Sequence, residues 1–147
     1  MIARIAGKLV RLSLREWREL FEAQWALLVA QSMLRSRPTG GLATPVSTVG
    51  VADPARMPDA RRLALAMLRA ARFGVFRPQC LVRSMALSRM LAAHGITGSM
   101  VRVGVRRKNG EFLAHAWVEL GGETLGDADE HVGTFAPLTN LDVQRPS

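Results

Sequence analysis

The chain of 147 residues contains one cysteine, Cys80. A single cysteine cannot form a disulfide within the chain, which argues against a disulfide-stabilised fold and for a reducing compartment. No secretory signal is recognisable at the N-terminus. The longest uncharged apolar stretch in that region covers only residues 23–34, whereas a membrane-spanning helix needs about 20 apolar residues. We therefore expect a soluble, cytoplasmic protein that does not associate with membranes.

Sequence motifs of several large functional classes are also missing. The chain has no glycine-rich phosphate loop, HExxH motif, paired-cysteine metal site or Gly-x-Ser-x-Gly motif. The 20 Lys and Arg residues outnumber the 12 acidic ones and give a net charge of +8. They are spread along the chain without a zinc-finger spacing or an aromatic nucleic-acid motif. We expect a solvated basic surface, with no nucleic-acid partner, no cofactor and no metal.

The N-terminal part is predicted to be helical. A basic amphipathic stretch covers residues 2–12, and Ser13 and Glu16 then form the pattern of a capping box. The helix that follows is predicted to extend to about residue 35. Its expected apolar stripe consists of Leu14, Trp17, Phe21, Trp25 and Leu28.

A loop with four prolines covers residues 38–58, and a second helix is predicted over residues 59–72. Asp59 is its expected N-cap, and Gly74 is its expected left-handed cap.

The C-terminal half combines a helix with strands. Residues 80–94 are apolar almost all round, which is typical of a buried helix. The pattern then alternates along residues 101–106, and Asn109-Gly110 is a strong hairpin signal. Two further strands are predicted, separated by Gly121-Gly122. The sequence therefore predicts an α+β fold, in which N-terminal helices precede a central helix packed on an antiparallel β-meander.

Cys80 lies at the first turn of the predicted buried helix. A thiol there faces unpaired backbone N–H groups and the positive end of the helix dipole, and both favour the nucleophilic thiolate. The alternative is an inert buried cysteine, which is the more common fate of a lone cysteine.

His115 is the first candidate for a base that takes the Cys80 proton, because flanking alanines leave room for a substrate beside the ring. His94 ends the same helix as Cys80 and would lie about 20 Å from it. His131, in the tail, is a weaker candidate.

Asp127 follows His115 by 12 residues and could accept from its second ring nitrogen. Asp129 is a close rival. With a strict two-residue turn at Gly121-Gly122, Asp127 would face Ala116 and point away from His115. Their contact then needs a longer loop, a bulge, or an Asp127 that has already left the ladder.

These residues, in this order, resemble the leader peptidase family of lasso-peptide biosynthesis, which belongs to the transglutaminase-like, papain-related cysteine proteins. The resemblance covers about residues 60–138 and is strongest at a CLxRS helix start and an AHAWVE strand. The family often carries Asn at the position of Gly126. The stretches that carry the resemblance are 80–87, 95–96, 103–106, 114–119 and 125–127.

The resemblance implies a triad of Cys80 as nucleophile, His115 as base and Asp127 as the residue that orients the base. It implies a lasso precursor peptide as substrate, a separate leader-recognition protein and a lasso cyclase as partners. Residues 59–147 would form the peptidase core. Residues 1–58 would form a helical segment and loop that docks a partner or covers the sheet. Two alternatives remain open: an acyl transferase of the same fold, and a non-enzymatic basic helical binding module.

Overall fold

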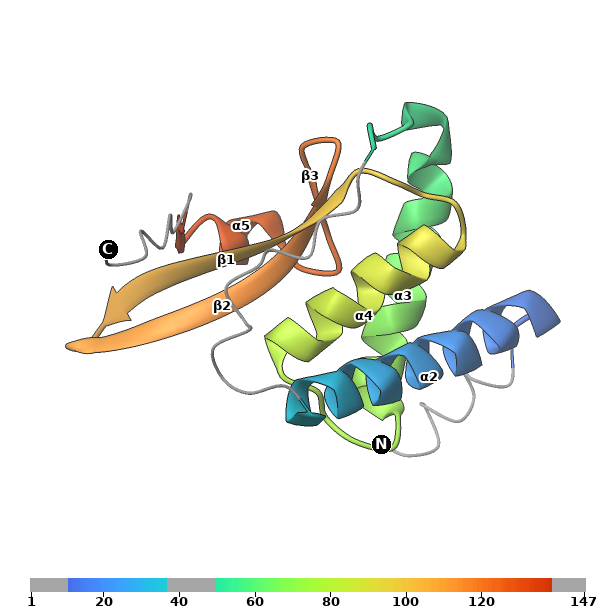
Figure 1. Cartoon of the computed structure of the whole chain (residues 1–147), viewed down its shortest axis with the longest axis horizontal. Helices are drawn as coiled ribbons and strands as arrows, with labels where there is room; N and C mark the ends of the chain where they lie inside the picture. Colours follow the sequence, from blue (N-terminus) through green and yellow to red (C-terminus); the bar gives the residue numbers. More distant parts are fainter. Residues whose placement is uncertain (1–10, 37–49, 139–147) are drawn as a thin grey trace.

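The computed structural model describes residues 11–36 and 50–138 of the chain. The amphipathic stretch expected at residues 2–12 and most of the loop expected at residues 38–58 lie outside these ranges. Three long helices gather at one end of the molecule, and a long β hairpin extends away from them (Figure 1). The helices are α2 (Leu14–Ser36), α3 (Met57–Phe73) and α4 (Cys80–Ala93).

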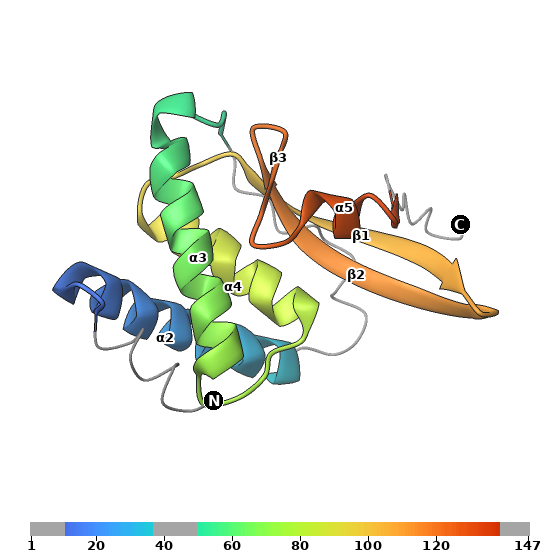
Figure 2. The same cartoon turned by 180° about the vertical axis from the view of Figure 1, so that it is seen from behind.

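The strands form one antiparallel sheet in the order β3-β2-β1-β4, seen from behind in Figure 2. The long hairpin pairs β1 (Ser99–Lys108) with β2 (Glu111–Leu120). Asn109 and Gly110 join them with φ angles of 52° and 85°, as the two-residue turn requires. The remaining elements are β3 (Glu123–Leu125), a short helix α5 (Asp129–Val132) and β4 (Ala136–Pro137).

Helix α4 forms the centre of the fold. Its Leu87 and Leu91 are buried in one hydrophobic cluster with Val101 of β1 and Val118 of β2. Helices α2 and α3 pack against α4 and against one another. The predicted α+β arrangement, with a buried central helix on an antiparallel meander, is thus confirmed. Among the described residues, no helix is long and apolar enough to cross a membrane.

The face of α2 that packs inward differs from the predicted one. Ala23, Leu27 and Ala30 are fully buried, whereas the predicted stripe of Leu14, Trp17, Phe21, Trp25 and Leu28 lies on the outside or at the margin. The helix has two apolar faces at the same spacing, and alanines on one of them allow the other helices to approach closely. Glu19 is also buried on this inner face, where Arg62 of α3 donates to it at 2.8 Å.

Both ends of α3 also differ from the prediction. The helix begins two residues earlier, after a 3₁₀ turn, η2 (Pro54–Arg56), which Asp53 caps through the Ala55 N–H. Asp59 is not the cap and binds Arg62 at 2.6 Å. Gly74 is extended rather than left-handed. A Cβ there would lie 1.8 Å from Oε1 of Gln24, so a close approach of α2 explains this glycine.

The predicted capping box at the start of α2 is confirmed. The Ser13 N–H donates to Glu16 at 2.8 Å, and the Glu16 N–H donates to the Ser13 hydroxyl at 3.3 Å. The predicted division between residues 58 and 59 falls inside α3. The separate docking and catalytic roles of its two sides stay a prediction.

Candidate active site

Cys80 is the first residue of α4 and is partly exposed. The preceding Gln79 has an extended backbone and makes no side-chain capping bond. The first helical hydrogen bond of this end runs from the Arg83 N–H to the Gln79 carbonyl at 3.0 Å. The amides of the first turn before Arg83 therefore have no partner within the helix, and they are donors for an acceptor placed at the start of α4.

His115 lies on β2, opposite Gly104 of β1. On the side of β2 away from β1, strand β3 pairs only with residues 118–120. Among the described elements, none pairs with β2 on that side next to His115. Helix α4 packs against β2. Within the part of the chain that the structure describes, the edge of β2 beside His115 is therefore open.

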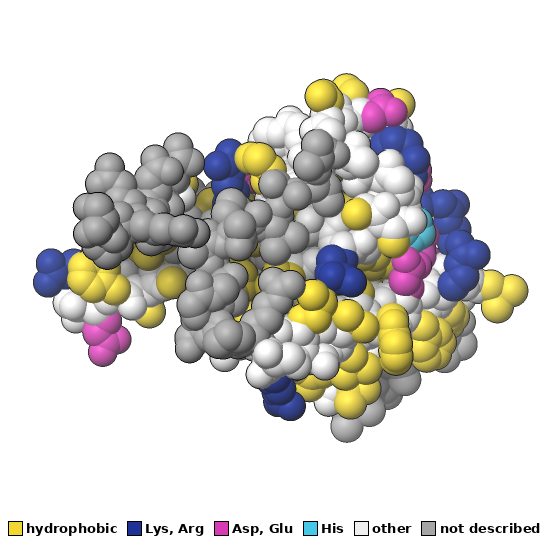
Figure 3. Space-filling model, viewed as in Figure 1, with side chains coloured by type: hydrophobic (Ala, Val, Ile, Leu, Met, Phe, Trp, Pro, Cys, Tyr) yellow, Lys and Arg dark blue, Asp and Glu magenta, His cyan; other side chains and the backbone are white. Residues whose placement is uncertain are grey.

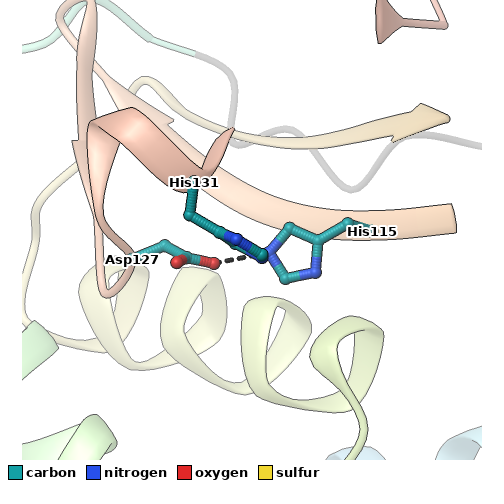
Figure 4. A group of neighbouring side chains, drawn as sticks. All are labelled: His115, Asp127 and His131. Carbon is teal, nitrogen blue, oxygen red and sulfur yellow. Dashed lines mark hydrogen bonds and ion pairs between the residues drawn. The ribbon is translucent and has the colours of Figure 1, made fainter. Parts of the chain in front are cut away.

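Asp127 reaches His115 because the chain leaves the ladder one residue earlier. The Gly121-Gly122 turn is a strict two-residue turn, since Leu120 pairs with Glu123. The ladder ends at Leu125, and Gly126 adopts a left-handed φ of 73°. Asp127 then turns back, so that its Oδ2 lies 2.5 Å from Nε2 of His115 (Figure 4). Of the arrangements that would allow this contact, the structure adopts early departure from the ladder.

Both oxygens of the Asp127 carboxylate have protein partners. Oδ1 accepts from the Ala128 N–H at 2.9 Å, and Oδ2 lies 3.5 Å from the guanidinium of Arg83 on α4. The side chains of His115 and Asp127 are only 12% and 14% exposed. This shielding from solvent strengthens their hydrogen bond and fixes the ring orientation.

The contact with Asp127 also determines which nitrogen of His115 is left for a second partner. Nε2 faces the carboxylate, and Nδ1 lies on the side of the ring turned away from Asp127 (Figure 4). A thiol that gives its proton to this imidazole must therefore meet Nδ1. Because Cys80 begins the helix packed against β2, the two residues stand on adjoining elements. Their pairing stays a prediction.

Aromatic rings surround His115. Phe135 lies 5.1 Å from it and Trp117 lies 6.2 Å from it, measured between ring centroids. A Cβ at Gly104 would come within 2.9 Å of both Trp117 and Phe135, so this glycine makes room for them. The rings of Trp117 and Phe135 limit how far the His115 ring can turn.

His131 belongs to the same group of rings as His115 and Phe135. Its ring meets His115 edge to face at 4.9 Å, from the short helix α5 (Figure 4). The sequence placed His131 in the tail as a weaker candidate base, whereas the folded chain brings it beside the first candidate. His94 lies elsewhere, with Nε2 2.8 Å from Glu22. Asp129 begins α5, and the carboxylate that contacts His115 is that of Asp127.

The same cluster contains a set of metal-ligand atoms. One donor atom each from His115, Asp127 and His131 lies within 4.8 Å of the others. Imidazole nitrogens and a carboxylate form a set that suits zinc. However, His115 and Asp127 already bond to one another, so a metal would have to separate them.

Sequence reasoning missed three residues around the pair: Arg83, Trp117 and Phe135. A signal existed for Arg83, since residues three apart on a helix share a face and Arg83 follows Cys80 by three. Trp117 shares a strand face with His115 by the period of two. No local pattern links Phe135 to the site, because only the return of the chain after α5 brings it there.

The profile of the transglutaminase-like superfamily matches residues 23–140, which include Cys80, His115 and Asp127. The chain belongs to the transglutaminase-like superfamily. Its mixed helices and antiparallel sheet agree with that family's α+β fold.

One curated relative is the microcin J25-processing protein McjB of Escherichia coli. It is 41% identical to this transglutaminase-like chain over 54 residues, which are 37% of this chain and 24% of the relative. The match thus spans about a quarter of the relative's length. No solved structure matches the chain.

Proposed function

We propose that this chain is a cysteine peptidase that removes the leader from a ribosomally made lasso-peptide precursor in the cytoplasm. The observation that carries the proposal is the hydrogen bond between Nε2 of His115 and Asp127, beside the helix that Cys80 begins. The similarity to a protein named for processing microcin J25 supports a peptide substrate. The nucleophile, base and orienting residue would be Cys80, His115 and Asp127.

The reaction would proceed in two steps. The Cys80 sulfur forms a bond to the scissile carbonyl carbon while Nδ1 of His115 takes the thiol proton. The C–N bond then breaks, and His115 gives that proton to the departing amine of the core peptide. In the second step, water loses a proton to His115 and attacks the thioester, which releases the leader as a carboxylic acid and restores the thiol.

The features of the site fit these steps. The Asp127 carboxylate holds Nε2–H, stabilises the imidazolium that forms and leaves Nδ1 for the proton transfers. The unpaired amides at the start of α4 provide donors for the negative charge on the carbonyl oxygen. A separate leader-recognition protein would present the precursor, and a lasso cyclase would use the released core.

The test is a cleavage assay with the purified chain, a synthetic precursor and the recognition protein, followed by mass spectrometry. The wild-type chain should release a leader that ends in a free carboxylate, and Cys80→Ala should release none. Ser84→Ala is a matched control, because Ser84 is a buried small residue one turn further along α4. Cleavage by Cys80→Ala at the wild-type rate would contradict the proposal.

Acyl transfer is the second candidate, because the superfamily profile that matches is transglutaminase-like. Its first step would be the same, and an amine rather than water would then attack the thioester. A primary amine added to the assay separates the two reactions. Product that carries the mass of the amine, and no free acid, would favour acyl transfer over hydrolysis.

A further inference from the structure

Helix α2 exposes a row of large apolar side chains on its outer side. Phe21 and Trp25 are each 69% exposed, and Leu14 is 90% exposed. With Leu28, these residues form what we call the Trp25 face. Figure 3 shows hydrophobic side chains gathered over α2 on this side of the molecule. No segment that the structure describes covers them.

Such exposure is costly for the isolated chain. Removing a large apolar side chain from water is favourable, so covering these four side chains with a partner would contribute to the free energy of binding. Contiguous apolar patches on soluble proteins mark interaction sites. Leu14, Phe21, Trp25 and Leu28 are separated by seven, four and three residues and so share one side of the helix, as do the anchors of a helix that inserts into a groove of a partner.

The charges around the face indicate the chemistry of the partner. The carboxylates of α2 are engaged within the chain: Glu16 with Arg69, Glu19 with Arg62 and Glu22 with His94. Arg18, by contrast, has no ion pair with any described residue, and it is exposed next to the apolar row. The face is therefore apolar with an uncompensated positive charge.

We infer that the Trp25 face docks a partner protein whose apolar groove is bordered by carboxylates. A second copy of this chain fits less well, because it would bring Arg18 and a net charge of +8 against the same charges. An anionic bilayer would be attracted by the same positive charge, so vesicles of phosphatidylglycerol are a separate arm of the test below. Aromatic residues and arginine are the types that dominate protein–protein interfaces.

This inference rests on the proposed function for the identity of the partner, which we take to be the leader-recognition protein. The Trp25 face belongs to α2, whereas the proposed chemistry lies at α4, β2 and the loop after β3. Docking and cleavage can therefore be measured separately.

The experiment measures binding of the purified leader-recognition protein to the full chain by calorimetry. The variants are Phe21→Glu, Trp25→Glu and Arg18→Glu. Phe112→Glu is the matched control, because Phe112 is an equally exposed aromatic side chain on the distant β hairpin. Trp25→Glu should weaken binding by about thirtyfold, the effect typical of an interface hot spot. Arg18→Glu should reduce the salt dependence of binding.

Cys80→Ala should bind the recognition protein like the wild-type chain. Loss of cleavage in Cys80→Ala tests the peptidase, and loss of binding in Trp25→Glu tests the docking surface, so either can fail alone. Circular dichroism and thermal unfolding must show that each variant stays folded. We expect this for the α2 variants because the substituted side chains lie on the surface.

Four results would overturn the inference. These are equal binding by Trp25→Glu and wild type, no binding by wild type, and binding by wild type to phosphatidylglycerol vesicles but not to the recognition protein. The fourth is fluorescence of Trp25 in the free chain at the wavelength typical of a buried indole. The Trp25 signal is taken as the difference between the spectra of wild type and Trp25→Phe. That emission would mean that this chain or a second copy already covers the face.

Discussion

His115 and Asp127 meet at 2.5 Å although a regular continuation of β3 would point their side chains to opposite faces of the sheet. The contact exists because the ladder stops at Leu125 and Gly126 turns the chain with a φ of 73°. Two short features of the backbone thus position the proposed orienting residue.

The first prediction concerns the Asp127 side chain. Asp127→Ala should lower the rate of leader cleavage by about 10⁴-fold, because His115 loses the carboxylate that orients the ring and stabilises the imidazolium. Asp127→Asn should lose a similar factor, because its neutral amide cannot stabilise the imidazolium and can turn its NH₂ group toward the ring. Asp129→Ala is the control and should cleave like wild type. If Asp129→Ala loses as much as Asp127→Ala, the assignment of the orienting residue is wrong.

A second prediction follows from the left-handed backbone of Gly126. Gly126→Ala should destabilise the chain by about 1–2 kcal/mol through backbone strain and displace Asp127. Gly126→Asn should be tolerated better, because Asn enters the left-handed region more readily. Both variants meet Leu87 with their Cβ at about the same 3.3 Å distance, so packing does not separate them. Thermal unfolding and cleavage rates measured side by side should rank Asn above Ala, and the reverse order would contradict this explanation.

The third prediction concerns the ion pair that ties β3 to α3. Glu123 accepts two bonds from Arg61, each 2.7 Å long, and these bonds lower the pKa of Glu123 from its ordinary value of 4.5. A lowered pKa means that the contribution is complete above 4.5 and is lost as the pH falls through the pKa of the folded state. Glu123→Gln should therefore be less stable than wild type at neutral pH, by a small amount for an exposed pair.

Denaturant unfolding of wild type and Glu123→Gln across acid and neutral pH measures this difference. The two curves should converge in strong acid, where Glu123 is protonated. A difference that persists unchanged in acid would show that Gln acts through packing and not through the lost charge.

The fourth prediction uses the donor atoms of His115, Asp127 and His131. Zinc should inhibit cleavage, because an ion held by these groups occupies the proposed base. Magnesium should not, since it prefers all-oxygen ligands. His131→Ala should require several-fold more zinc for the same inhibition. Calorimetry of zinc binding to Cys80→Ala provides a readout without the thiol, and equal affinity in Cys80→Ala and Cys80→Ala/His131→Ala would contradict the shared site.

Local patterns predicted the elements that depend on near neighbours. The capping box at Ser13, the Asn109-Gly110 hairpin and the buried helix from Cys80 all rest on short spacings, and all are present. The α+β arrangement follows from their order along the chain.

Features that depend on distant contacts could not be predicted in this way. The aromatic row of α2 has the same helical spacing as the alanine face that packs inward, and only the shape of α3 and α4 selects between them. His131 and Phe135 reach His115 only because the chain folds back after β3. The predicted β ladder was compatible with several positions of the Asp127 side chain relative to His115. The left-handed backbone of Gly126 determines which of them the chain adopts.

The alkylation rate of Cys80 tests the central claim, the pairing of Cys80 with His115, most directly and without any substrate. An ordinary thiol is only a few per cent thiolate at neutral pH. If His115 and the start of α4 hold Cys80 as a thiolate, iodoacetamide should modify it at neutral pH at least about tenfold faster than free cysteine. His115→Ala should slow this reaction strongly. Alkylation of wild type no faster than free cysteine, unchanged in His115→Ala, would contradict the pairing and favour a non-enzymatic binding module.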